Sequence, residues 1–183
     1  QRQMCIRDRD TPADAIVEGG YPNVYAYRFD WDEQPTILGM DFSFLLGAGH
    51  GLEIPFVMGD FDFGKQTRFL FTKKNENERN KLSKVIMQYW THFAKKGYPS
   101  NESENITLWD KWPKGGINQN RIMILDTEQS NAPRMSNGYV PHNKLVTIFE
   151  NDERSLKVDN KCNFLEDVYS WVDNWKSKNN FCQ

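Results

Sequence analysis

One histidine in the sequence stands in a setting suited to acid–base chemistry. His50 lies within the string Gly-Ala-Gly-His-Gly at residues 47–51, and an acid, Glu53, follows three residues later. Glycines on both sides let the backbone turn sharply and remove side chains that would block access to the imidazole. A general base on a loop needs this kind of presentation to a cleft. We therefore take His50 as the candidate base and Glu53 as its candidate partner.

The other two histidines have simpler interpretations. His92 falls inside a predicted helix, where we expect it to pack at the edge of the apolar stripe, and His142 follows a proline in a polar loop. No histidine stands four residues from His50, so the sequence lacks the paired-histidine zinc motif. The glycine spacing also differs from the dinucleotide-binding fingerprint. We predict no metal ion and no cofactor.

Local sequence patterns indicate the elements that must hold the histidine loop. Aromatic and β-branched residues predict strands over residues 24–31 and 121–126. Apolar residues at helical spacing predict an amphipathic helix over residues 77–96, with an apolar stripe that includes Phe93. Shorter helices are expected over residues 12–20 and 164–176, irregular backbone over 47–51, and loops over 98–107 and 127–144.

Composition excludes several classes of protein. The chain has 183 residues, enough for roughly one domain. Its net charge of −2 argues against a nucleic-acid-binding protein, which would need a basic face. No apolar run approaches the roughly 18 residues of a membrane span. The three cysteines, Cys5, Cys162 and Cys182, lack the Cys-x-x-Cys spacing of zinc or redox sites, and they permit at most one internal disulfide.

The first nine residues differ from the sequence that follows. They carry three arginines and no apolar stretch, so they are not a signal peptide. The string Met-Cys-Ile-Arg-Asp-Arg at residues 4–9 resembles a translated sequencing adapter. We predict that residues 1–9 are not native and that the domain occupies residues 10–183. The natural start would then be missing, which leaves the localisation of the protein open.

The residues around His50 resemble the type-B carboxylesterase and cholinesterase family. Residues 49–59 are similar to that family's pattern His-Gly-x-Glu-Ile-x-Phe-Val-Phe-Gly, with Met58 in place of the second phenylalanine. Residues 87–99 resemble the family's Met-x-x-Tyr-Trp-x-x-Phe-Ala-x-x-Gly-x-Pro. Further resemblances occur in the expected order at residues 24–29, 109–113 and 122–125.

The resemblance implies an α/β-hydrolase fold and a Ser–acid–His triad in that chain order. His50 matches the family's catalytic histidine. Glu53 matches a glutamate beside the triad, which would orient the histidine and is not the triad acid. The chain contains no Gly-x-Ser-x-Gly elbow and no glycine-rich oxyanion segment, both of which precede this region in the family.

The resemblance therefore implies that residues 10–183 are the C-terminal part of an α/β-hydrolase, with an incomplete central sheet and packed helices. Such a fragment of a serine esterase would be inactive alone, and its partner would be the missing N-terminal part of the same polypeptide. The substrate would be a small ester. Leu52 stands where cholinesterases have an aromatic residue, which favours a neutral carboxylic ester over a choline ester.

Two alternatives come from other functional classes. The same fold hosts non-catalytic adhesion or interaction modules that have lost triad residues, because fold does not determine function. The chain is also rich in aromatic residues, which would suit a carbohydrate-binding module with Trp31, Trp109 and Trp112 as stacking platforms. The sequence predicts neither the oligomeric state nor the disulfide status of Cys162 and Cys182.

Overall fold

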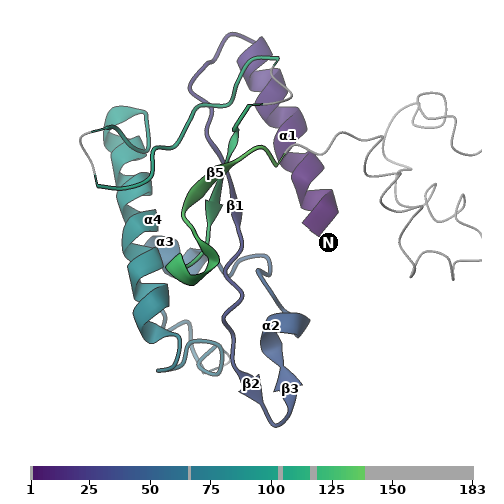
Figure 1. Cartoon of the computed structure of the whole chain (residues 1–183), viewed down its shortest axis with the longest axis vertical. Coiled ribbons are helices and arrows are strands. Elements are labelled where there is room, and N and C mark those ends of the chain that lie inside the picture. Colours follow the sequence, from purple (N-terminus) through teal and green to yellow (C-terminus); the bar gives the residue numbers. More distant parts are fainter. Residues whose placement is uncertain (1, 66, 103–104, 116–118, 139–183) are drawn as a thin grey trace, which may run out of the picture. The chain divides into compact units, whose positions relative to one another are not determined.

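The computed structural model describes residues 2–65, 67–102, 105–115 and 119–138 (Figure 1). Residues 9–138 form one compact unit. A second unit combines residues 1–8 with residues 139–183, and only its residues 2–8 are described. The predicted helix over residues 164–176 lies outside the described residues, as do His142, Cys162 and Cys182.

Helices and short strands alternate along the described chain. In chain order the elements are α1 (Arg2–Glu18), β1 (Ala26–Phe29), β2 (Thr36–Ile37), β3 (Met40–Asp41), α2 (Phe42–Leu45), α3 (Ile54–Met58), α4 (Glu76–Lys96), β4 (Ile122–Leu125), the 3-10 helix η1 (Glu128–Ser130) and β5 (Arg134–Ser136).

The main sheet contains three of these strands in the order β1-β4-β5. Strand β1 pairs with β4 in parallel, with Ala26 opposite Ile122 and Phe29 opposite Leu125. Strand β4 pairs with β5 in antiparallel orientation. The connection from β1 to β4 contains α4, as a parallel pair requires. Parallel strands joined through a helix, with helices beside the sheet, confirm the predicted α/β class (Figure 1).

The two faces of the sheet contact different helices because side chains alternate along a strand. On one face, Ala26 of β1 packs with Ala13 and Val17 of α1. On the other face, Tyr27 of β1 forms an edge-to-face ring contact of 5.2 Å with Trp90 of α4. The residues of β4 follow the same alternation: Ile122 and Ile124 lie with α1, and Met123 and Leu125 lie with the cluster that includes α4.

Aromatic rings form the interior on the α4 side. Trp31 and Phe56 are completely buried, with ring centroids 5.0 Å apart. Tyr89 of α4 contacts Trp109 at 5.1 Å, and the Tyr89 hydroxyl donates to the Thr107 carbonyl at 2.7 Å. The interpretation of Trp31, Trp109 and Trp112 as sugar-stacking platforms is wrong, because all three side chains are buried in the interior.

Helix α4 confirms the prediction over residues 77–96 to within one residue. Acidic residues occupy its first turn and two lysines its last turn, where each charge is favourable to the helix dipole. Gly97 ends the helix with a φ of 77°, a left-handed conformation that suits glycine. The predicted stripe is wrong at Phe93, which is 45% exposed although its ring lies 5.8 Å from that of Tyr25.

Other elements also differ from the sequence-based predictions. The predicted helix over residues 12–20 extends back to Arg2, as α1. The prediction that residues 1–9 are not native stays a prediction. The predicted loop over residues 127–144 contains η1 and β5. The hairpin β2–β3 was not predicted, and it turns through Leu38 and Gly39, both with positive φ as tight hairpin turns require.

Candidate functional site

The loop that carries His50 is a succession of tight turns between α2 and α3. Gly47 and Gly51 have φ angles of 52° and 84°, which are left-handed conformations that favour glycine. Within the loop, Gly49 N donates to Gly47 O at 2.9 Å, and Leu52 N donates to Gly49 O at 3.2 Å. His50 is exposed at the surface. The structure therefore confirms the predicted irregular backbone and presents the imidazole outward.

Side chains from elsewhere in the chain anchor both ends of this loop. At its start, the buried Gln34 donates from Nε2 to the Gly47 carbonyl at 2.7 Å. At its end, the buried Ser83 of α4 donates from Oγ to the Phe56 carbonyl in α3 at 2.8 Å. An exposed loop would otherwise be free to move. These two hydrogen bonds and the buried ring of Phe56 fix the backbone on either side of His50.

Helix α3 ends against the same helix that supplies Ser83. Gly59 closes α3 with a φ of 68°. A Cβ atom at this position would lie 2.7 Å from Sδ of Met87 in α4, so a larger residue would require the Met87 side chain to move. Glycine suits position 59 mainly because of this left-handed backbone conformation.

Glu53 lies at the N-terminal boundary of α3. Its carbonyl accepts hydrogen bonds from Phe56 N and Val57 N, each at 3.1 Å. Burial raises the pKa of Tyr27 in β1, and the negative charge of the half-buried Glu53 raises this pKa further. Among the described residues no hydrogen bond joins Glu53 to His50. The orienting role of Glu53 therefore stays a prediction.

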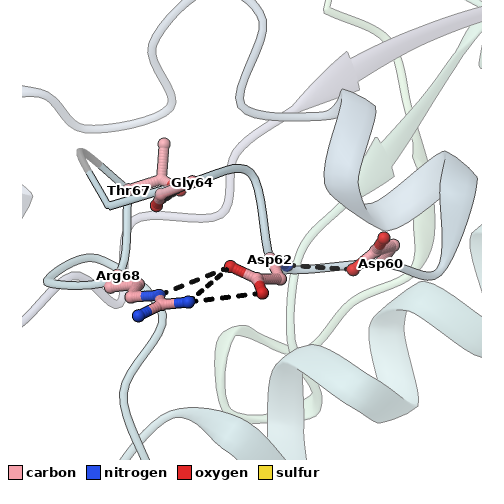
Figure 2. Close-up of polar contacts among 5 residues, drawn as sticks. All are labelled: Asp60, Asp62, Gly64, Thr67 and Arg68. Carbon is pink, nitrogen blue, oxygen red and sulfur yellow. Dashed lines mark hydrogen bonds and ion pairs between the residues drawn. The ribbon is translucent and has the colours of Figure 1, made fainter.

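The loop that follows α3 is closed by its own polar groups (Figure 2). Asp62 N donates to a carboxylate oxygen of Asp60 at 2.9 Å, and Thr67 Oγ1 donates to the Gly64 carbonyl at 3.1 Å. Arg68 contacts the Asp62 carboxylate at 3.4 Å, with both side chains about two-thirds exposed. A surface ion pair of this kind contributes roughly 0–1 kcal/mol. Within the part of the chain that the structure describes, no three metal-ligating side chains gather into a site.

Carboxylates at the C-terminal ends of β1 and β4 were not singled out from the sequence. Asp30 follows β1 and receives two hydrogen bonds from Nε of Arg28, at 2.8 and 2.9 Å. Asp126 follows β4 and is buried, which raises the pKa of its carboxyl group. The negative charges of Asp32 and Asp30 raise it further. The sequence signal that could have identified these carboxylates is an acidic residue directly after a predicted buried strand.

A pocket of about 370 Å³ opens at the opposite end of β1. Its lining includes Tyr25, Tyr98 and Trp109, together with Lys96 and Lys111. His50 is not among the residues that line this pocket. The exposed imidazole and the pocket are therefore separate features.

Comparison with known proteins determines the family. The profile of the Carboxylesterase family matches residues 10–143, most of the chain. The chain belongs to the carboxylesterase family. The match includes His50, Glu53 and every element from β1 to β5, which supports the predicted α/β-hydrolase fold.

Curated relatives of this carboxylesterase chain are much longer proteins. Para-nitrobenzyl esterase of Bacillus subtilis is 32% identical over 120 residues, covering 66% of this chain and 21% of the relative. Acetylcholinesterase of Danio rerio is 28% identical over 167 residues, covering 85% of this chain and 24% of the relative. The chain thus spans about a fifth to a quarter of the length of these relatives.

A solved structure of a PNB esterase is similar at 33% sequence identity, with a TM-score of 0.36. The match covers 56% of this carboxylesterase chain and 17% of that structure. Among the described helices, none combines the length and apolarity that crossing a membrane requires.

Proposed function

We propose that this chain is the C-terminal part of a serine carboxylic-ester hydrolase, here called the parent protein, and that His50 is its catalytic base. The observation that carries the proposal is the exposed imidazole on a loop held at both ends by Gln34 and Ser83. Membership of the carboxylesterase family and the small share of each relative that the chain covers support the same conclusion.

In this mechanism the His50 imidazole removes the proton from a serine hydroxyl in the preceding part of the parent protein. The serine oxygen attacks the ester carbonyl, and the imidazolium then gives the proton to the departing alcohol. Water, activated by the same imidazole, releases the carboxylic acid. Glu53 keeps the imidazole oriented, since a base must lie within hydrogen-bond reach of the proton that it removes.

We infer a neutral carboxylic ester as the substrate class. The relatives include a para-nitrobenzyl esterase, a human cocaine esterase and acetylcholinesterases. Leu52, two residues from His50, is aliphatic and packs partly against the aromatic interior. A quaternary ammonium group is recognised by aromatic rings, which Leu52 does not provide.

The 183-residue chain alone should have no esterase activity, because it carries no Gly-x-Ser-x-Gly elbow. Loss of the nucleophile costs a factor of about 10⁶ in kcat in a related serine hydrolase. A purified preparation should therefore hydrolyse p-nitrophenyl acetate only at the background rate. Turnover that disappears in His50→Ala would show that another nucleophile operates in this chain.

The decisive experiment uses the parent protein, expressed from the uninterrupted gene. We expect His50→Ala to lower kcat by several orders of magnitude while the melting temperature stays nearly unchanged, because the exposed imidazole contributes little packing. His92→Ala is the matched control, because His92 lies in α4, where it contacts the Tyr98 carbonyl and ring. It should retain activity.

The alternative of a non-catalytic adhesion or interaction module makes opposite predictions. A parent protein without a Gly-x-Ser-x-Gly elbow, or one whose hydrolysis survives His50→Ala, would overturn the enzyme proposal. A reactive serine in the parent protein, detected by covalent labelling with a fluorophosphonate probe, would support the enzyme proposal.

A further inference from the structure

The pocket at the start of β1 has no part in the proposed hydrolysis. Its volume of about 370 Å³ lies within the range of small-molecule sites, roughly 300–1,000 Å³. Three segments that are distant in the sequence form its walls, around residues 23–25, 96–100 and 109–111. We call it the two-lysine pocket, after Lys96 and Lys111 in its lining.

Hydrogen bonds between the segments hold the walls of the pocket together. Trp109 N donates to Ser100 Oγ at 2.8 Å, which joins the third segment to the end of α4. Trp112 N donates to the Val24 carbonyl at 2.7 Å, which joins the third segment to the first. The pocket therefore exists before any ligand arrives, and binding would cost little ordering of the chain.

Aromatic rings make up the apolar part of the lining. Trp109 is almost fully buried and contacts the half-buried Tyr25 edge-to-face at 6.4 Å. Tyr98 is also half-buried, and its ring lies 5.3 Å from that of His92. Tyr25 and Tyr98 thus keep part of their ring surface open. Such surfaces favour a ligand that carries a flat ring.

The charges in the lining favour an anion. Lys111 donates from Nζ to the neutral Asn23 Oδ1 at 2.7 Å, and Lys96 stands exposed in the last turn of α4. Among the described residues, neither lysine forms an ion pair with a carboxylate. Asp110 is the one acidic side chain in the lining. Two ammonium groups against one carboxylate give the pocket a net positive charge, which attracts a negative ligand.

The hydroxyl groups and the size of this charge indicate which anion fits best. Ser100 Oγ accepts from Trp109 N, so the hydroxyl hydrogen of Ser100 remains available for a ligand oxygen. Burial raises the pKa of Tyr25, which keeps its phenol protonated and able to donate. A carboxylate only accepts hydrogen bonds, and its single charge matches the excess of one lysine over Asp110. A phosphate ester would bring a second negative charge close to Asp110.

We propose that the two-lysine pocket binds a small aromatic carboxylate. The carboxylate lies toward Lys96, Lys111 and Ser100, and the ring lies against the open surfaces of Tyr25 and Tyr98. The inference does not rest on the proposed function, because His50 is not among the residues that line the pocket.

Calorimetric titration of the 183-residue chain with naphthoate at low salt tests the proposal. Replacing Lys96 and Lys111 together by Met should weaken binding at least about tenfold, because the attraction between opposite charges is lost. The matched control replaces Lys74 and Lys84 by Met, two exposed lysines outside the pocket, and should leave the affinity unchanged. Equal affinities of the two double variants would overturn the proposal, as would the absence of binding to the unmodified chain at millimolar naphthoate.

Three further ligands test the chemical class. Neutral naphthamide should bind at least about tenfold more weakly than naphthoate, and inorganic phosphate should also bind more weakly because it has no ring. Naphthamide binding as tightly as naphthoate would overturn the role of charge. Phosphate binding as tightly would overturn the role of the rings. Tighter binding of naphthyl phosphate would overturn the choice of a carboxylate.

His50→Ala separates this site from the proposed catalytic one. The variant should bind naphthoate as the unmodified chain does, and a loss of binding would place the ligand at His50 and overturn the inference. A parent protein that binds naphthoate through the two lysines but lacks hydrolysis would contradict the proposed function alone. One that hydrolyses esters through His50 but does not bind naphthoate at the lysines would contradict only the inference about this pocket.

Discussion

The two sides of the His50 loop differ in how they are built. On the α3 side, Phe56 is fully buried among aromatic rings and its carbonyl is held by Ser83. On the α2 side, Leu38 and Phe44 are almost fully exposed, and a single side-chain hydrogen bond from Gln34 secures the chain at Gly47. The histidine thus lies between a buried aromatic region and an exposed apolar one.

This difference indicates that the two sides of the loop contribute differently to the stability of the fold. The aromatic interior between α4 and the sheet gives α3 a fixed position, which defines where the loop ends. The α2 side contributes an exposed apolar surface, which adds little to the stability of the interior. Stability and activity should therefore respond to different residues, and four experiments test this separation.

The largest effect on stability should come from the aromatic interior. Phe56 contacts the rings of Phe29, Trp31 and Phe61 at about 5 Å. Phe56→Ala should destabilise the chain by about 3–5 kcal/mol, because it leaves a cavity. Phe44→Ala, on the exposed surface, should change stability by no more than about 0.5 kcal/mol. Urea unfolding followed by near-ultraviolet circular dichroism measures both; similar losses would contradict the comparison.

The second-largest effect on stability should come from removing the hydrogen bond between α4 and α3. Ser83→Ala leaves the buried Phe56 carbonyl without its donor, which should cost about 1–3 kcal/mol. Ser43→Ala removes a hydroxyl that donates to Asp41 on the surface, and it should have little effect. Unfolding in urea compares the two variants. If Ser43→Ala were the more damaging, α2 would be the better-fixed side of the loop.

Glu53→Gln in the parent protein should have a moderate effect on catalysis. The substitution keeps the size of the side chain and removes its charge, so the imidazole would be less well oriented while the base remains. We expect kcat to fall roughly tenfold, equivalent to about 1.4 kcal/mol, with KM unchanged. A loss as large as that of His50→Ala, with stability intact, would make Glu53 the triad acid.

The smallest effect should be on the pH dependence of the protein's stability, through the carboxyl group of Asp126. Burial raises the pKa of this carboxyl, so the folded state binds a proton more readily than the unfolded state. Stability should therefore fall as the pH rises above about 4, the usual aspartate pKa, through the raised value. Asp126→Asn keeps the oxygen that accepts from Thr127 N and should abolish this fall.

Unfolding midpoints across the acidic range would show the effect of Asp126→Asn. The exposed Asp62→Asn serves as the control, and it should leave the slope unchanged. A wild-type protein that gains stability as the pH rises through this range, by an amount that Asp126→Asn removes, would contradict the assignment.

The elements with strong local signals were predictable from the sequence. The 3.6-residue period identified α4, four consecutive apolar residues identified β4, and the glycines identified the irregular loop at His50. The two-residue strands of the hairpin and the three-residue β5 gave no such signal, because they are too short to show an alternating pattern. The same limit applies to the anchors of the loop: Gln34 and Ser83 reach carbonyls 13 and 27 residues away.

The pairing of β1 with β4 has a consequence for how the chain is made. Ala26 lies opposite Ile122, and the hairpin, the His50 loop, α3 and α4 all fall between them in the sequence. During synthesis β1 leaves the ribosome long before its neighbour exists, and pairing over such a separation makes folding slow. Until β4 arrives, the aromatic strand is an exposed edge that invites aggregation. The segment that carries the histidine therefore gains its fixed position late in translation, and chaperone binding during this interval should favour β1.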